Sequence, residues 1–321
     1  MNKIAFILLL TITSFKGYCQ KPDTLIKKLD SLSRKTDSAN GQKNNTTQSA
    51  YNENTKLNVA SYFILLGSDL KQEFTKPFHT TRRDWGKFAA FAVGVGALTF
   101  VDEPIQKQAL QFKNNNPSAS NISHIVTNIG GPGEVVGLGS LGIYSFIAKN
   151  VKLQTTTLLA SQAYITGSLA EGVLKFLSGR TRPSYYGPNV DAEPSFQGPF
   201  ANTSHDFTGA RSNSSFPSGH ATVAFAAATV YSMEYRKTVW VPIVAYSAAS
   251  LISISRITEN KHWTTDVLVG AMLGYLTGKH IVDNYHRYAK LKSPGTPKNS
   301  VSFNMDYYNG QLRPGLVYHI R

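Results

Sequence analysis

Six apolar segments, each rich in alanine, glycine or valine, recur between residues 88 and 277. They are longer than typical strands and lack the alternation of a half-buried strand, so we expect each to be a helix. Their small residues allow helices to approach one another closely. The pattern therefore predicts an all-α fold, a bundle of about six core helices. The segments are Phe88–Val101, Val135–Ala148, Leu158–Leu177, Gly219–Met233, Val239–Ile254 and Val267–Thr277.

The N-terminal residues 1–19 are predicted to be a signal peptide. They have Lys3 near the start, then a short apolar run, then small residues before Gln20. A lipoprotein is the alternative, because the only cysteine, Cys19, ends this segment, but Lys16 and Tyr18 fit a lipidation site poorly. A single cysteine also excludes a disulfide framework.

Polar stretches flank the bundle, which we place at residues 59–290. Residues 20–58 are predicted to be a polar linker, partly disordered, because most of them lack an apolar face. In the tail, residues 291–321, apolar residues alternate with polar ones and then meet Asn309–Gly310, a turn signal. We expect a small β-hairpin there.

A long connection, residues 184–216, is rich in glycine, proline, serine and asparagine. Loops of this length are usually functional or disordered. Two interpretations stay open, a lid that selects substrates or a tolerated surface insertion.

The net charge indicates which kinds of binding partner suit the chain. The chain has 321 residues and a net charge of +14, from 33 Lys and Arg against 19 Asp and Glu. Such an excess suits an anionic lipid surface or nucleic acid. The sequence shows no nucleic-acid-binding motif, so we favour the lipid surface; a basic secreted protein with no polyanionic partner is the alternative.

Three polar clusters lie at the ends of apolar segments, at Lys175–Pro183, Pro217–His220 and Ser255–Asp266. Together they supply three cations, two imidazoles, a hydroxyl and a carboxylate. This inventory suits an oxyanion with several negative oxygens, which points to phosphate.

The third cluster places His262 and Asp266 four residues apart, on one side of a helical turn. A carboxylate beside one ring nitrogen fixes the tautomer and raises the basicity of the other. The alternatives are a surface pair or half of a metal site.

In the second cluster, Ser218 and Gly219 open a predicted helix, whose free N–H groups bind anions. His220 would lie beside the anion and could give it a proton. A serine-hydrolase role for Ser218 is weaker, because no Gly-x-Ser-x-Gly elbow is present.

The cations Lys175, Arg182 and Arg256 complete the set. Arginine can bind two phosphate oxygens at once, whereas lysine acts as a point charge. Single basic residues at helix ends are usually dipole partners, so the hypothesis depends on the joint pattern.

The three clusters, in this order and with these internal spacings, resemble the signature of the type 2 phosphatidic acid phosphatase superfamily. That superfamily includes bacterial acid phosphatases and vanadium haloperoxidases. The clusters span about a third of the chain. The resemblance implies a helical fold and a phosphoric ester hydrolase that needs no metal or other cofactor.

The resemblance also implies a role for each residue. His262 would attack phosphorus and form a phosphohistidine, and Asp266 would orient it. His220 would protonate the leaving oxygen. The phosphoryl oxygens would be held by Lys175, Arg182, Ser218, Gly219 and Arg256. Spacing alone does not decide which of the two histidines is the nucleophile.

The charge pattern bears on the membrane. If the three clusters share one face of the bundle, a set of six Lys and Arg residues lies at the opposite face, as expected of a cytoplasmic face. We therefore expect a bacterial envelope protein whose active site faces the periplasm. An integral and a soluble bundle both stay open, because the longest charge-free runs are shorter than the usual ~20 residues. The basic set is Lys149, Lys152, Arg236, Lys237, Arg287 and Lys290.

The leading hypothesis is a phosphatase acting on a lipid phosphate, such as phosphatidic acid, an isoprenyl diphosphate or a lipid A. The alternatives are a non-specific periplasmic acid phosphatase acting on small soluble phosphomonoesters, a vanadium haloperoxidase, and an envelope protein that only binds phosphate groups. We expect membrane association and no nucleic-acid partner.

Overall fold

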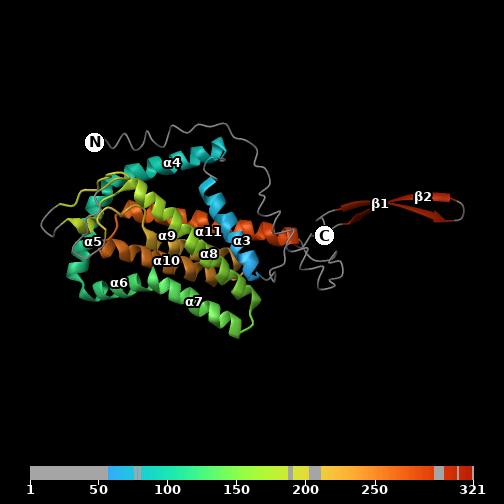
Figure 1. Cartoon of the computed structure of the whole chain (residues 1–321), viewed down its shortest axis with the longest axis horizontal. Coiled ribbons are helices and arrows are strands. Elements are labelled where there is room, and N and C mark those ends of the chain that lie inside the picture. Colours follow the sequence, from blue (N-terminus) through green and yellow to red (C-terminus); the bar gives the residue numbers. More distant parts are fainter. Residues whose placement is uncertain are drawn as a thin grey trace.

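A computed structural model describes residues 57–75, 78, 81–186, 191–201, 211–292, 300–308 and 311–319 (Figure 1). The fold is all-α, as the sequence predicts, with a small hairpin near the C-terminus. The helices are α3 Val59–Thr75, α4 Arg82–Leu98, η2 Thr99–Val101, α5 Asp102–Asn115, α6 Pro117–Ile129, α7 Pro132–Ile147, α8 Val151–Ser178, η3 Pro183–Tyr185, α9 Gly219–Glu234, α10 Trp240–Thr258 and α11 Thr264–Lys292.

The six predicted apolar segments fall in α4 with η2 and in α7 to α11. The prediction missed α5 and α6, because α5 is mostly polar and α6 is interrupted by serine and asparagine. Both helices pack on α10. The predicted signal peptide and almost all of the linker lie outside the described residues.

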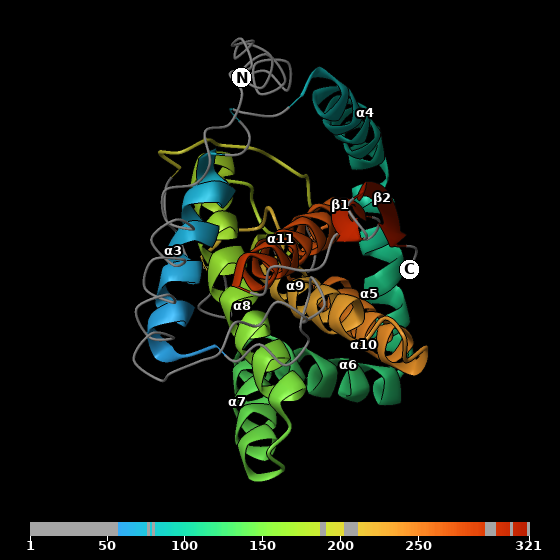
Figure 2. The same ribbon diagram turned by 90° about the vertical axis from the view of Figure 1, so that its right-hand side faces the viewer.

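The core surrounds α9, which contacts α8, α10 and α11 (Figure 2). Three glycines at four-residue spacing on α11 lie against α9. A Cβ added at Gly274 would lie 2.1 Å from the carbonyl oxygen of Thr222, and added at Gly270 it would lie 2.5 Å from that of Ser218. Only glycine lets the two backbones come this close.

The consequence of this close packing appears at one end of the bundle. The backbone N–H of Ser218, just before α9, donates to the carbonyl of Asp266, in the first turn of α11, at 2.9 Å. The C-terminal ends of α8 and α10 reach the same end, because Arg182 donates to the carbonyl of Lys261 at 3.1 Å. The three clusters, far apart in sequence, therefore meet.

The tail forms the predicted hairpin. Strand β1, Ser300–Tyr308, pairs antiparallel with β2, Gln311–His319. The register places Ser300 opposite His319 and Tyr308 opposite Gln311. The predicted turn residues 309–310 lie outside the described residues.

Two described helical stretches, Arg82–Asn115 and Trp240–Thr258, are long and apolar enough to cross a membrane. Only 6% and 28% of their apolar windows are buried inside the molecule. A core helix of a water-soluble protein would be mostly buried, so these low fractions leave large apolar faces uncovered.

Candidate active site

A cavity of about 250 Å³ lies where the three clusters meet. Six of the eight predicted site residues line it, whereas Ser218 and Asp266 lie behind its wall. The lining residues are Gly131, Tyr164, Ser168, Glu171, Lys175, Arg182, Gly219, His220, Val223, Arg256 and His262. Both imidazoles and all three predicted cations thus share one small space.

The end of α8 is shaped by Gly179. This residue has a left-handed φ of 53°, and its N–H donates to the carbonyl of Lys175. A Cβ here would lie 2.2 Å from the carbonyl oxygen of Gly198. The turn ends the helix at Ser178, within one helical turn of Lys175, and leads the chain back across the site as Arg180 and Arg182.

The imidazole of His262 is almost completely buried, with 2% of its side chain exposed. Its Nδ1 lies 2.7 Å from the carbonyl oxygen of Ser215 and 3.6 Å from Oδ2 of Asp266. A carbonyl can only accept, so Nδ1 carries the proton and Nε2 keeps its lone pair. The closest acceptor is therefore a loop carbonyl, and the orienting role expected of Asp266 stays a prediction.

Asp266 is held by donors on every side. Its Oδ2 accepts from the N–H of Trp263 at 2.9 Å and from the hydroxyl of Ser215, while Oδ1 accepts from Arg180. Several hydrogen bonds to the charged form stabilise a buried carboxylate. Ser215 was not predicted, although it lies only three residues before the second cluster's serine.

Asp266 belongs to a fully buried network of ion pairs with Arg180 and Asp102. The Nη1 of Arg180 donates to Asp266 and to the hydroxyl of Thr265, and its Nη2 donates to Asp102 at 2.6 Å. Asp102 also accepts from the N–H of Thr265 at 2.9 Å. The guanidinium lies 4.9 Å from the ring centre of Phe196.

Sequence reasoning missed both Arg180 and Asp102. Arg180 lies inside the first cluster, so its position was the available signal. No sequence signal marks Asp102, because it lies at the start of the polar helix α5, outside the three clusters.

The three predicted cations differ in their surroundings. Arg182 donates to the carbonyls of Arg211, Ser214 and Lys261 at 3.1–3.2 Å, which fixes its guanidinium. The Nε of Arg256 is buried, with no hydrogen-bond partner among the described residues. Lys175 pairs with Glu171 at 2.9 Å.

The start of α9 needs its glycine. A Cβ at Gly219 would lie 2.7 Å from Oε1 of Glu171, so this position admits no side chain without movement. The hydroxyl of Ser218 is buried and unpartnered within the described chain. Its predicted contact with phosphate stays a prediction.

Both imidazoles are neutral, because each is buried beside three cations. Burial lowers the pKa of His262 well below its usual range, and the charges of Arg182, Arg256 and Lys175 add to the effect. Burial, followed by Arg256, Lys175 and Arg182, lowers the pKa of His220 to about 3. A neutral imidazole beside three cations is a competent nucleophile toward an anionic ester.

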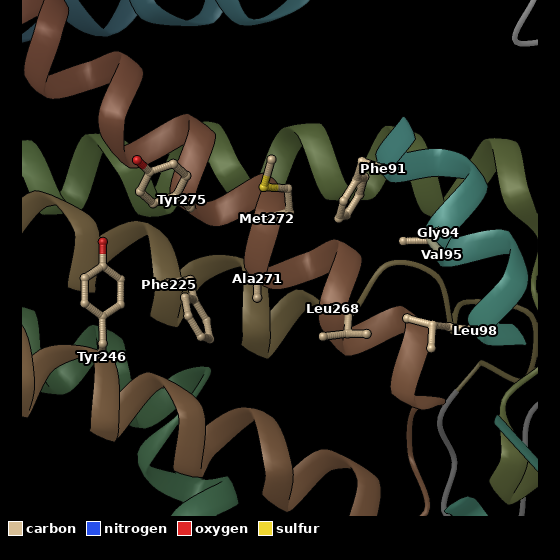
Figure 3. A pocket seen from close by; sticks show the side chains of 10 residues that line it. All are labelled: Phe91, Gly94, Val95, Leu98, Phe225, Tyr246, Leu268, Ala271, Met272 and Tyr275. Atoms are coloured by element: carbon tan, nitrogen blue, oxygen red, sulfur yellow. The ribbon is translucent and has the colours of Figure 1, made fainter. Parts of the chain in front are cut away.

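A larger cavity, about 690 Å³, lies between α4, α9, α10 and α11 (Figure 3). Its lining is apolar, as Phe91, Leu268 and Met272 illustrate, and it includes no cation. It does not suit a phosphate group. Among the described ranges, no three His, Cys, Asp or Glu side chains are grouped as metal ligands would be.

The fold and site define an α-helical protein with a small cationic cavity that contains two neutral imidazoles. Residues 156–289 match the model of the PAP2 superfamily, and this range includes all three clusters. This match to the superfamily's model confirms the resemblance seen in the sequence.

One curated protein is also similar over part of the chain. The lipid A 1-phosphatase of Porphyromonas gingivalis is 46% identical over 67 residues, which are 21% of this chain. The match spans only 15% of the length of that relative.

Two solved structures are similar. The transmembrane PAP2 type phosphatidylglycerolphosphate phosphatase of Bacillus subtilis has 20% identity and a TM-score of 0.42, over 71% of this chain and 96% of that one. Aquifex aeolicus LpxE has 20% identity and a TM-score of 0.29, over 51% and 93%.

Proposed function

We propose that this protein is a phosphatase of the bacterial envelope that hydrolyses lipid phosphomonoesters or diphosphates. The observation that carries the proposal is the 250 Å³ cavity in which His220 and His262 share one space with Lys175, Arg182 and Arg256. Three cations neutralise a phosphoryl group and the charge of its transition state.

In the first step, Nε2 of His262 attacks phosphorus. The bond from phosphorus to the leaving oxygen breaks as the nitrogen–phosphorus bond of a phosphohistidine forms. His220 gives its proton to the leaving oxygen, which departs as an alcohol. Because burial and the nearby cations keep His220 neutral, the proton must arrive as the anionic substrate binds and raises the basicity of His220.

In the second step, water attacks the phosphohistidine. Neutral His220 takes a proton from this water, phosphate leaves, and His262 is regenerated as a neutral imidazole. The guanidinium groups and Lys175 hold the phosphoryl oxygens in both steps, together with the N–H of Gly219. The scheme uses only protein groups, so we expect activity to survive EDTA.

The lipid substrate is supported by the two apolar stretches. We propose that Arg82–Leu98 and Trp240–Thr258 insert into the membrane, because exposed large side chains such as Val93, Trp240 and Val244 have no cover in the described chain. The 67 residues shared at 46% identity with the lipid A 1-phosphatase of Porphyromonas gingivalis also support a lipid substrate.

The proposed orientation is supported by charge. The turn between α7 and α8 carries Lys149, and the first turn of α8 carries Lys152. The turn between α9 and α10 carries Arg236 and Lys237, and all four lie at the end of the bundle opposite the cavity. Placing this basic end in the cytoplasm puts the active site in the periplasm.

The experiment is phosphate release by the purified full chain in detergent micelles. Lipid A, phosphatidic acid, an isoprenyl diphosphate and a soluble phosphomonoester are compared, with and without EDTA. His262→Ala is expected to lower kcat by about three orders of magnitude or more. Alkaline quenching of the wild type should trap phosphohistidine, and equal turnover by the variant would refute the mechanism.

The same assay addresses the alternative of a soluble-substrate phosphatase. Turnover of the soluble ester at the same kcat/KM as the lipids would favour that alternative.

A further inference from the structure

The loop between α6 and α7 closes one side of the cavity against His220. Gly131 has a φ of 59°, and a Cβ there would lie 2.8 Å from Nε2 of His220. A Cβ at Gly130 would lie 2.5 Å from the side chain of Ile252. This tight packing sets the first turn of α7 beside the histidine that protonates the leaving oxygen in the proposed mechanism, and thus on the leaving-group side.

Glu134 lies in that first turn. Both of its carboxyl oxygens are shielded from solvent and have no hydrogen-bond partner among the described residues. Burial raises the pKa of Glu134 to about 8. A buried polar group without a partner is unfavourable, and native proteins usually keep one only where a ligand or water completes it. No structural role in the described chain accounts for this carboxyl group.

The neighbours of Glu134 are also oxygen-bearing groups. Tyr164 and Ser168 line the cavity from α8, and the charges of Glu134 and Glu171 both act on the Tyr164 hydroxyl. The oxygens of Glu134, Tyr164 and Ser168 can all accept a hydrogen bond from an O–H or N–H group. None of these three side chains offers a cation to a second phosphate.

Resting on the proposed phosphatase function, we propose that Glu134 reads the leaving group of the substrate. Its carboxyl group, held beside Tyr164 and the loop on His220, binds an O–H or N–H donor on the carbon next to the one that bears the phosphate. The substrate class is then a lipid phosphomonoester of a sugar, amino sugar or polyol, and not an isoprenyl diphosphate.

The test uses the full chain in detergent micelles and a matched pair of substrates. Lysophosphatidic acid has a hydroxyl next to its phosphate-bearing carbon, and its deoxy analogue lacks only that group. We expect the wild type to prefer the hydroxylated substrate in kcat/KM by about tenfold, the effect of one good hydrogen bond. An isoprenyl diphosphate should be slower than both.

Two variants assign the preference to Glu134. Glu134→Leu should slow the hydroxylated substrate, so that the kcat/KM values of the two substrates differ by no more than about twofold. Glu134→Gln should keep part of the preference, because its amide oxygen still accepts a hydrogen bond. The control Glu193→Gln removes an exposed carboxylate outside the cavity and should keep the full preference.

The outcomes separate the two proposals. A wild type that hydrolyses both lipids without preference, or prefers the isoprenyl diphosphate, overturns the role of Glu134 and leaves the phosphatase function standing. A wild type that hydrolyses no phosphate ester overturns both. Should Glu134→Leu fail to fold, the wild-type preference and Glu134→Gln still decide the question.

Discussion

Arg180 joins two carboxylates that lie 164 positions apart in the chain, because one guanidinium nitrogen binds Asp266 and the other binds Asp102. All three side chains are completely buried. The pair of ion bridges ties the start of α5 to the start of α11. Since Asp266 also lies 3.6 Å from Nδ1 of His262, this network supports the proposed nucleophile.

Removing Arg180 should therefore affect stability and catalysis together. Arg180→Gln leaves two buried carboxylates without their cation, and breaking a buried pair in this way costs roughly 3–5 kcal/mol. We expect a lower Tm in detergent and a lower kcat. Arg236→Gln, an exposed arginine at the other end, is the control and should change neither. Wild-type values for Arg180→Gln would show that the network is dispensable.

The proposed proton donor can be tested through the leaving group. His220→Asn should slow hydrolysis of alkyl phosphates by about 10²- to 10⁴-fold, because their leaving oxygen needs a proton. p-Nitrophenyl phosphate leaves as a stable phenolate, so its hydrolysis should suffer far less. Rates for both substrates check this, with His124→Asn, an exposed histidine on α6, as the control. An equal loss on both substrates would argue against a proton-donor role.

The neutral histidines predict an acid-sensitive fold. The unfolded chain protonates its histidines near their usual pKa of about 6.5, while His220 stays neutral down to about 3. Between these values the unfolded state binds more protons, so the free energy of unfolding falls as the pH falls. Unfolding followed from pH 8 to 4 checks this.

His262 contributes in the same direction, since burial lowers its pKa as well. In the double variant His220→Asn/His262→Asn, the decline below about pH 6.5 should be shallower than in the wild type. Inorganic phosphate should raise the Tm of the wild type, because this anion binds the cationic cavity of the folded state. An identical pH dependence in the double variant would contradict the assignment.

The contact between α9 and α11 gives a prediction remote from the cavity. Gly274→Ala places a Cβ against the carbonyl of Thr222 and should destabilise the protein by about 1–3 kcal/mol through overpacking. It should also lower activity, since it separates the two helix starts that carry His220 and Asp266. Gly86→Ala is the control, because no atom lies within 4 Å of the added Cβ.

The sequence predicts the helical core well, because long apolar runs such as Leu158–Leu177 carry a strong signal. It fails for α5, whose polar side chains form a helix through contacts with α10 that no local pattern encodes. The three clusters predict which residues reach the cavity. They do not predict Asp102 or Glu134, since these residues lie outside the clusters, on α5 and α7.

The acceptor for Nδ1 of His262 belongs to the main chain, at Ser215. Every amino acid provides a carbonyl oxygen, so this hydrogen bond does not depend on the type of side chain at residue 215, provided that the backbone keeps its path. A mutational scan of side chains would therefore overlook the contact that sets the tautomer of His262, the proposed nucleophile. Its disruption requires a change in the path of the backbone, through an insertion or deletion between residues 211 and 217, which makes the length of this segment the inherited constraint.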